Sequence, residues 1–244
     1  MKAILTGHSR GLGAAIAENL LSRQIPVLAL ARTKNAELAQ RFPAALTQVE
    51  LDLADSNALA QWLKGQTLRK FLEGCRTALL INNAGTVQPV GPLDLQDVST
   101  IARAVTLNVA APMMLASAVA AATPEANDRR ILHVSSGAGR SPYPGWSVYC
   151  ATKAAMDQHA RAAALDKMRA LRICSLAPGI IDTDMQAEIR ATSLQQFPLR
   201  EKFDTLKRNG ELVSPQSCAK RLVDYLLVEK FGAEPVADLR SLGG

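Results

Sequence analysis

Short runs of apolar residues alternate along the chain with longer stretches in which apolar residues recur every three or four positions. The short runs predict β-strands, because a run of this length fits a strand that is buried on both faces. A further short strand is expected near Val236. The six main predicted strands are residues 3–6, 26–30, 46–50, 78–81, 131–134 and 171–176.

The stretches between these strands have the apolar spacing of amphipathic helices. Ser214 followed by Pro215 predicts the start of a final helix that extends to about Val228, since serine is a favoured N-cap and proline fits the first helical turn. The other predicted helices are residues 11–21, 36–41, 56–71, 97–122 and 146–168.

The alternation of strand and helix predicts an α/β fold, a Rossmann-like doubly wound parallel sheet of about seven strands with helices on both faces. Parallel strands need crossover connections, and right-handed crossovers place the helices against the sheet. Residues 181–210 mix polar and apolar positions and are interpreted as a segment that covers the substrate. Neither a linker nor a repeat interrupts the pattern, so residues 1–244 are expected to form one domain.

Composition and charge exclude several classes of partner. The chain has 28 Lys and Arg against 22 Asp and Glu, a net charge of +6, but the basic residues are dispersed among acids with few aromatics, unlike a nucleic-acid-binding surface. The longest apolar run, residues 109–122, contains Pro112 and falls short of the roughly 18 residues needed to span a bilayer. The N-terminus lacks a signal pattern, and the four cysteines are far apart. We expect a cytoplasmic protein with reduced thiols, no metal, and neither a membrane nor a nucleic-acid partner.

The segment TGHSRGLG, residues 6–13, connects the first predicted strand to the first predicted helix. Doubly wound folds bind dinucleotides at this connection, because small residues let the backbone approach a pyrophosphate whose charge meets free amides at the helix N-terminus. A tight turn without a ligand is the alternative, since the glycine spacing alone is only moderately specific. The candidate cofactor-binding residues here are Gly7, Ser9, Arg10, Gly11, Leu12 and Gly13.

The second predicted strand leads into Arg32, where NAD-specific sites usually carry a carboxylate. Arg32 and Arg10 offer guanidinium groups that suit bidentate binding of a 2′-phosphate. NADPH/NADP⁺ is therefore predicted in preference to NADH. The alternative interpretation of Arg32 is a solvated strand end.

Tyr149 and Lys153 are four residues apart at the start of a predicted helix, so they share one face. A neighbouring ammonium favours a phenolate, so Lys153 is expected to lower the pKa of Tyr149. Ser136 follows a strand at the edge where such sheets bind ligands, and its hydroxyl suits a substrate carbonyl. Taken singly, each feature also fits a surface helix or a strand-end cap, but together they provide a proton donor, a polarised carbonyl and a hydride site.

These motifs resemble the short-chain dehydrogenase/reductase family, in order and over essentially the whole chain. TGHSRGLG is similar to the cofactor turn of the family, LDL at 51–53 to its adenine-contacting segment, and NNAG at 82–85 to its motif after the fourth strand. The Pro-Gly pair that follows the sixth predicted strand resembles the segment that contacts the nicotinamide carboxamide. The resemblance implies these further cofactor-binding residues: Asp52, Leu53, Asn83, Ala84, Gly85, Tyr149, Lys153, Pro178, Gly179, Ile181 and Thr183.

The resemblance also implies a catalytic tetrad of Asn108, Ser136, Tyr149 and Lys153. NADPH would deliver hydride to a ketone, Tyr149 would protonate the oxygen, and Ser136 would orient and polarise the carbonyl. Lys153 would also bind the nicotinamide ribose, and Asn108 would position a water in a proton relay to Lys153. The implied activity is that of an NADP-dependent short-chain oxidoreductase acting on CH–OH or C=O groups.

Within the family, residues 145–150, 177–186 and 209–214 resemble the branch of sepiapterin reductases and (S)-benzoin-forming benzil reductases. This resemblance implies reduction of one carbonyl of a diketone. A 3-oxoacyl or general alcohol dehydrogenase of the same family is the alternative enzyme, and a non-catalytic NADP(H)-sensing protein is the alternative of another class. Sepiapterin reductases hold the pterin with a C-terminal acidic residue, for which Asp238 is the candidate in this chain.

Residues around the tetrad suggest a substrate pocket and a partner subunit. Tyr143 and Trp146 precede Tyr149 and suit an aromatic wall for a flat or aryl substrate, or local packing of a Pro-rich loop. Met185, with Ile189 and Phe197, would either close over the substrate or pack in the core or a dimer contact. The apolar helices predict a homodimer or a homotetramer.

Overall fold

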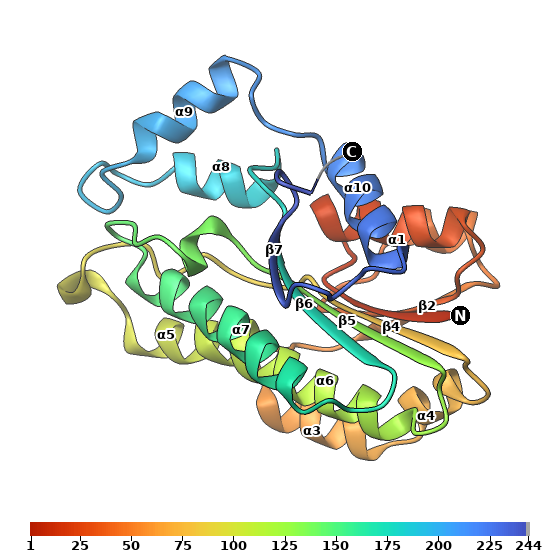
Figure 1. Ribbon diagram of the computed structural model, residues 1–244. Coiled ribbons are helices and arrows are strands. Elements are labelled where there is room, and N and C mark those ends of the chain that lie inside the picture. The colour runs from red at the N-terminus through yellow and green to blue at the C-terminus, as the bar shows by residue number, and fades with distance from the viewer. Residues whose placement is uncertain (243–244) are drawn as a thin grey trace.

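The computed structural model describes residues 1–242 and contains one seven-stranded parallel sheet (Figure 1). The strand order is β3-β2-β1-β4-β5-β6-β7, which confirms the predicted fold class. Each predicted strand is present within three residues of its expected ends. The strands are β1 (Lys2–Thr6), β2 (Val27–Ala31), β3 (Leu46–Glu50), β4 (Thr77–Asn82), β5 (Asp128–Val134), β6 (Leu171–Ala177) and β7 (Val236–Asp238).

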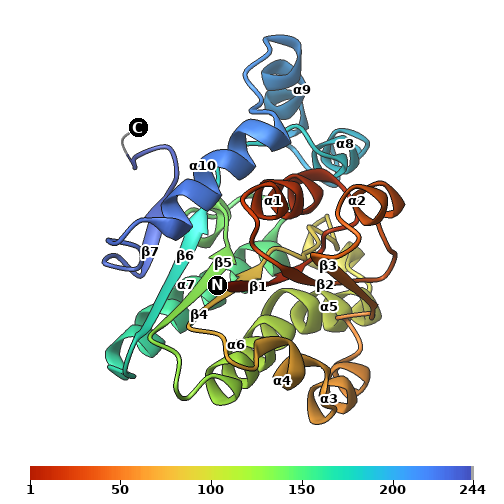
Figure 2. The ribbon, with the colours of Figure 1, turned by 90° about the vertical axis from the view of Figure 1, so that its right-hand side faces the viewer.

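Helices cover both faces of this sheet (Figure 2). One face carries α1 (Gly11–Ser22), α2 (Ala36–Arg41) and α10 (Pro215–Leu227). The opposite face carries α3 (Ser56–Lys64), α4 (Thr67–Leu72), α5 (Val98–Val105), α6 (Ala111–Ala122) and α7 (Ser147–Leu165). The segment interpreted as a cover forms α8 (Asp184–Arg190) and α9 (Arg200–Arg208), at the end of the molecule towards which the strands point in Figure 1.

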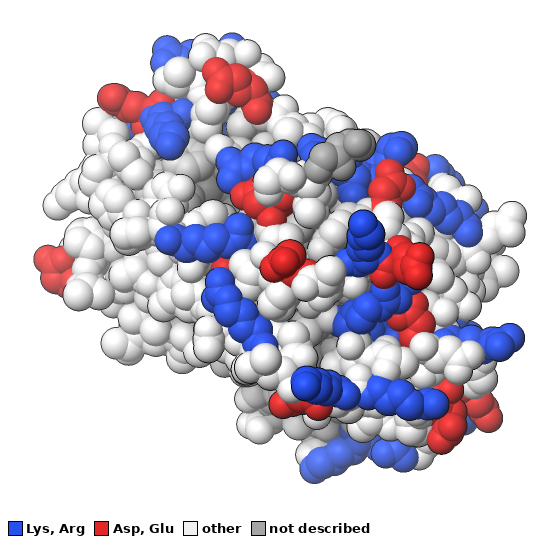
Figure 3. Space-filling model, viewed as in Figure 1, with Lys and Arg blue, Asp and Glu red and all other residues white. Residues whose placement is uncertain are grey.

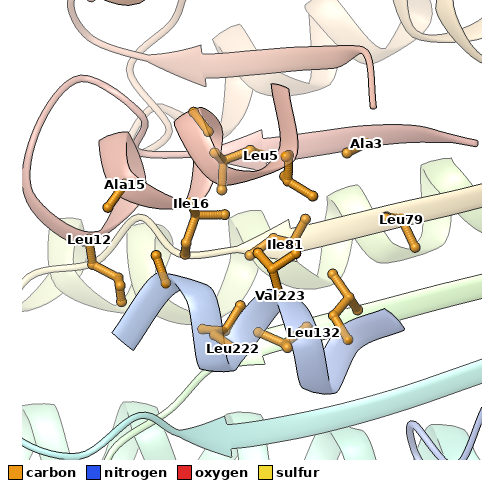
Figure 4. Packing of buried hydrophobic residues seen from close by; sticks show 14 of the residues in the cluster. Ala3, Leu5, Leu12, Ala15, Ile16, Leu79, Ile81, Leu132, Leu222 and Val223 are labelled. Atoms are coloured by element: carbon orange, nitrogen blue, oxygen red, sulfur yellow. The ribbon is translucent and has the colours of Figure 1, made fainter. Parts of the chain in front are cut away.

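Two apolar layers hold the helices to the sheet. Figure 4 shows the first, in which Ile16 of α1 and Leu222 of α10 pack over Leu5 and Ile81 of neighbouring strands. The second lies under α6 and includes Leu115 and other fully buried side chains. Burial of a large aliphatic side chain contributes about 1.5–3 kcal/mol, so these layers fix the positions of the strand ends that form the site.

Two helix predictions were wrong in detail. Residues 56–71 form two helices rather than one, because the backbone adopts an extended conformation at Gly65, the C-cap of α3. Residues 97–122 contain a π-helical turn, Thr106–Ala110, between α5 and α6. Such turns place an extra residue in the helix and are frequent at functional sites. Here the turn contains Asn108.

The run from α5 through α6 is long and apolar enough, by length and composition alone, to cross a membrane. Such evidence is weak, since core helices pass the same test, and Leu115 and Val119 of this run are buried in the second apolar layer. The expectation of no membrane partner stays a prediction. On the face shown in Figure 3, basic and acidic side chains are interspersed, as the sequence suggested.

Candidate active site

A cleft of about 920 Å³ lies at the carboxyl ends of the central strands. It is centred on β1 and β4, where successive crossovers leave for opposite faces of the sheet, the usual ligand position in open α/β folds. The structure brings nearly all the predicted site residues together here. Each predicted cofactor and substrate residue lines the cleft, as do Ser136, Tyr149 and Lys153; Asn108 lies behind the wall.

The glycine turn has the shape that a pyrophosphate requires. Gly7 has a φ of +73°, a conformation that favours glycine. A Cβ on Gly13 would lie 1.9 Å from the Gly7 carbonyl oxygen, so only glycine lets α1 approach the turn this closely. The side chain of Arg10, the N-cap of α1, makes no capping hydrogen bond, which leaves the first helical amides for a ligand. The turn therefore fits a dinucleotide.

A threonine that the motif analysis did not single out ties this turn to the loop after β4. The buried Thr6 hydroxyl accepts hydrogen bonds from the Asn83 and Ala84 amides, at 2.9 and 3.0 Å. The Asn83 side chain donates in return to the carbonyls of Thr6 (3.0 Å) and Gly7 (3.2 Å). Asn83 and Ala84 thus brace the cradle. A polar residue that ends an apolar strand was the available signal for Thr6.

His8, the residue after Gly7 in the turn, is fully buried. Its Nε2 lies 2.6 Å from Oε1 of Gln48 on β3. Burial lowers the pKa of His8, with the Gln48 hydrogen bond acting in the opposite direction, so the neutral ring is favoured. This histidine fixes the turn to the sheet edge.

The far end of the cleft is lined by guanidinium groups. Arg32 is exposed beside Asp52, and Arg103 of α5 donates to Asp52 at 2.9 Å. Partial burial alone would raise the pKa of Asp52, but hydrogen bonds from Arg103 and the Ala54 amide outweigh it, so the pKa is lowered. Asp52 is therefore ionised and held by Arg103, a partner that sequence reasoning missed. In the part of the chain that the structure describes, the Arg32 guanidinium makes no ion pair with Asp52 and lines the cleft, where a ligand can contact it.

Tyr149 and Lys153 lie on α7, both largely buried at the inner end of the cleft. The Lys153 Nζ donates to the Val134 carbonyl at 2.8 Å and lies 5.6 Å from the centre of the Tyr149 ring. Ser136 follows β5, and its Oγ accepts from the Ala138 amide at 3.2 Å. The three side chains therefore come together from one helix and one strand end, as the sequence predicted.

The expected effect of Lys153 on Tyr149 was wrong. Burial raises the pKa of Tyr149 to about 12, against a smaller opposing contribution from the Ser136 hydroxyl. Burial also lowers the pKa of Lys153 to about 8, partly offset by Asp157. Neither pKa carries a contribution from the other residue of the pair, so burial sets the direction of both shifts. Tyr149 is thus protonated at neutral pH, the state that a proton donor needs.

Asn108 holds the loop after β4 against α7. Its Nδ2 donates to the Thr86 carbonyl at 2.8 Å and to the Thr152 hydroxyl at 3.1 Å, and its Oδ1 accepts from the Thr86 amide at 2.9 Å. A Cβ added to Gly85 would lie 3.2 Å from Asn108 Oδ1 and 3.8 Å from Lys153 Nζ. The π-helical turn therefore brings Asn108 to the rear of the Lys153 site. Its function in a water relay stays a prediction.

A buried carboxylate that the sequence analysis did not identify supports the tetrad. Asp157, one helical turn after Lys153, accepts hydrogen bonds from the hydroxyls of Ser135 (2.8 Å) and Ser175 (2.7 Å) and from Nε of Arg140 (3.2 Å). These bonds join α7 to Ser175 of β6 and to Ser135, which lies between β5 and Ser136. A polar residue on the inner face of a helix was the only sequence signal.

Replacing Asp157 with Ala is expected to lower the free energy of unfolding by about 3 kcal/mol, since it leaves a guanidinium and two buried hydroxyls without their acceptor. Denaturant unfolding measures this loss. Asp166→Ala, at the exposed C-cap of the same helix, serves as the matched control. Equal losses in the two variants would contradict the assigned role of Asp157.

The aromatic residues near Tyr149 form a packed cluster more than an open wall. Trp146 is almost fully buried and stacks on Phe197, with ring centres 4.5 Å apart. Phe197 is fully buried and does not line the cleft, so of the two interpretations offered for it, core packing is correct. Tyr143 and Met185 are partly exposed in the cleft. Phe203, which we had not proposed as a site residue, also lines the cleft but is almost fully buried.

Comparison with known proteins places this geometry in a family. The short chain dehydrogenase family model matches residues 1–194. The chain belongs to this family. A benzil reductase ((S)-benzoin forming) of Bacillus cereus is 37% identical, over 93% of this chain and 94% of that protein. Sepiapterin reductase of Bos taurus is 34% identical, over 93% of this chain and 90% of that protein.

Among solved structures, a short-chain dehydrogenase/reductase from Burkholderia vietnamiensis shares 48% identity, with a TM-score of 0.73, over 99% of this chain and 98% of that one. This short-chain dehydrogenase is thus an NAD(P)-dependent oxidoreductase of carbonyl and alcohol groups, related to the benzil and sepiapterin reductases. Both expectations from the sequence, the family and the branch, are confirmed.

Proposed function

We propose that this short-chain dehydrogenase is an NADPH-dependent carbonyl reductase that reduces one carbonyl of a diketone, with Tyr149 as the proton donor. The observation that carries the proposal is the buried, protonated Tyr149 beside Lys153 and Ser136 in a cleft whose other end fits a dinucleotide. General acid catalysis requires a proton on the donor at working pH, and Tyr149 meets this requirement.

The bound nicotinamide would supply a hydride to the carbonyl carbon. The residues of the chain orient the carbonyl and provide the proton. The Ser136 hydroxyl donates a hydrogen bond to the substrate oxygen, Tyr149 Oη transfers its proton to that oxygen, and the Lys153 ammonium stabilises the phenolate that remains. Asn108 holds the loop behind Lys153 and, we propose, a water through which Tyr149 is reprotonated.

The preference for NADPH over NADH is proposed from charge. Arg32 is exposed in the cleft beside Asp52, which Arg103 already engages, and Arg10 of the glycine turn is a second guanidinium in the cleft lining. A 2′-phosphate would receive charge-assisted hydrogen bonds from such groups. The neighbouring Asp184 pairs with Arg10 at 3.2 Å, so Arg32 is the less engaged of the two.

Arg32→Ala is therefore expected to raise the KM for NADPH about tenfold or more, and to leave the KM for NADH nearly unchanged. Steady-state kinetics with both cofactors measures the change. Lys34→Ala is the matched control, since Lys34 is exposed nearby but pairs with Glu50 at 3.4 Å and does not line the cleft. A parallel rise for both cofactors would refute a contact between Arg32 and the 2′-phosphate.

The substrate class is proposed from the relatives together with the cleft. The benzil and sepiapterin reductases that match nearly the whole chain are named for carbonyl substrates. Tyr143, Met185 and Phe203 provide apolar surface beside Tyr149.

We further propose that α8 and α9 cover the bound substrate. We also propose that the protein is a cytoplasmic homodimer or homotetramer of one domain, without a nucleic-acid partner.

The experiment is loss of NADPH absorbance with purified protein against benzil, 1-phenyl-1,2-propanedione, sepiapterin, an acetoacetyl thioester and simple ketones, repeated with NADH. Turnover of the diketones with NADPH is expected. Preference for the thioester would favour the 3-oxoacyl alternative. Cofactor binding without turnover of any carbonyl would refute the proposed reduction and favour a sensor.

A further inference from the structure

A charged pair at the carboxyl end of β7, Asp238 within the strand and Arg240 after it, is not used by the proposed reaction. Arg240 lines the cleft, whereas Asp238, two residues earlier, does not. From the sequence, Asp238 was the candidate for an acidic residue that contacts the substrate. In the structure its carboxylate faces Arg240, so the charge presented to the cleft is positive.

Asp238 fixes the guanidinium of Arg240 in two directions. Nε of Arg240 donates to Oδ1 at 2.9 Å and Nη2 donates to Oδ2 at 2.6 Å, a bidentate pair. The carboxylate also accepts from the Arg240 backbone amide at 2.9 Å. Behind it, Arg140 lies 3.8 Å away and donates to the Ala237 carbonyl at 2.8 Å. Such a held guanidinium loses little conformational freedom when it binds a ligand.

The position of Arg240 relates it to the substrate rather than to the cofactor phosphates. A Cβ on Gly179 would lie 3.6 Å from both Cγ and Cδ of Arg240, so the stem of the side chain runs across the Pro-Gly turn after β6. Tyr143, a predicted substrate residue, lies near enough to contribute to the raised pKa of Arg240, after the larger effect of Asp238. Both neighbours line the same cleft.

Arg240 retains donors for a ligand. Within residues 1–242, no hydrogen-bond acceptor lies against its Nη1, and 64% of the side chain is exposed. Among the acids that line the cleft, Asp52 pairs with Arg103 and Asp184 with Arg10. Glu188, exposed on α8, is the remaining acid of the lining.

We propose that Arg240 binds an anionic group of the substrate, so that, beside neutral diketones, the protein reduces oxo acids, in which a carboxylate accompanies the carbonyl, more efficiently than their esters. The proposal rests on the proposed reductase function. A guanidinium already oriented by Asp238 offers its open edge to a planar carboxylate, for which its geometry is suited. Asp238 acts as a positioning residue that holds Arg240 over Gly179.

The test compares phenylglyoxylate with its methyl ester, which share the ketone and the ring and differ in charge. In the wild-type protein with NADPH, kcat/KM is expected to be higher for the acid. Arg240→Leu is expected to lower the acid-to-ester ratio of kcat/KM about tenfold or more, and Arg240→Lys to restore part of it. Arg161→Leu, an exposed arginine on α7, is the matched control.

A binding measurement separates recognition from turnover. Calorimetry of phenylacetate and phenylacetamide with the NADP⁺-loaded protein is expected to show tighter binding of the carboxylate, lost in Arg240→Leu and weakened in Asp238→Asn. Turnover of neutral diketones with equal use of acid and ester in all variants would refute the anion site and leave the reductase proposal standing. Carboxylate binding that depends on Arg240, without turnover of any ketone, would support the anion site and refute the reductase.

Discussion

Tyr149→Phe is expected to lower kcat for diketone reduction by about 100- to 10,000-fold, the range over which positioned proton transfer contributes to catalysis. The phenyl ring retains the packing of Tyr149 against Trp146, whose ring centre lies 5.4 Å away, so the fold and cofactor binding should persist. Only the proton donor is removed. Stopped-flow or steady-state loss of NADPH absorbance measures the change.

Tyr225→Phe is the control, because it removes a phenol that does not line the cleft and leaves the proposed proton donor in place. Its kcat should remain within a few-fold of the wild type. Equal NADPH affinity in the wild type and in Tyr149→Phe, measured by fluorescence titration, would show that the loss is chemical. If Tyr149→Phe kept full turnover, the assigned proton donor would be wrong.

Gly13→Ala is expected to abolish NADPH binding or to prevent folding. The new Cβ would lie 1.9 Å from the Gly7 carbonyl oxygen and 2.6 Å from Nδ2 of Asn83. Neither atom belongs to a flexible side-chain end, since Asn83 is held by Thr6 and Gly7. Helix α1 must therefore move away from β1, which opens the cradle for the pyrophosphate.

The measurement pairs thermal unfolding with NADPH titration, so that a misfolded variant is separated from a folded one that does not bind. Gly137→Ala is the control, because a Cβ at Gly137 would meet no atom within 4 Å. It should fold and bind NADPH like the wild type. Normal binding by Gly13→Ala would contradict the close approach on which the cradle depends.

The fold was predictable because apolar runs and helical spacing are local signals. The parallel sheet follows from their alternation, and its strand ends differ from the prediction by three residues or fewer. Two interruptions were missed. The helical spacing of apolar residues continues on both sides of the turn at Gly65 and of the π-helical turn around Asn108. The spacing therefore predicted one continuous helix in each region.

The motif residues were predictable because strand ends meet at one edge of the sheet. The structure places Gly7, Ser136 and Tyr149 around one cleft as expected. The hydrogen bonds of Asp157 that support these residues were not predictable, since Asp157 and Arg140 meet only through the tertiary fold. The same reason explains why the pKa of Tyr149 was predicted in the wrong direction: sequence spacing shows the neighbouring lysine but not the burial that raises the pKa.

Side-chain direction near the end of the chain was likewise not predictable from the sequence. Asp238 and Arg240 are two residues apart in a strand-like tail, and the sequence does not tell which of them faces the cleft. The structure turns Asp238 towards Arg240 and Arg140, and the arginine towards the site. The substrate contact that the sequence suggested for Asp238 is therefore proposed for Arg240 instead.

The most direct test of the central claim is transfer of deuterium from NADPH dideuterated at nicotinamide C4 to benzil, followed by mass spectrometry of the product. Hydride transfer by this protein predicts benzoin with one deuterium on the carbinol carbon, and loss of that product in Tyr149→Phe. Benzoin formed without deuterium, or no product from any carbonyl compound while NADPH binds normally, would contradict the account.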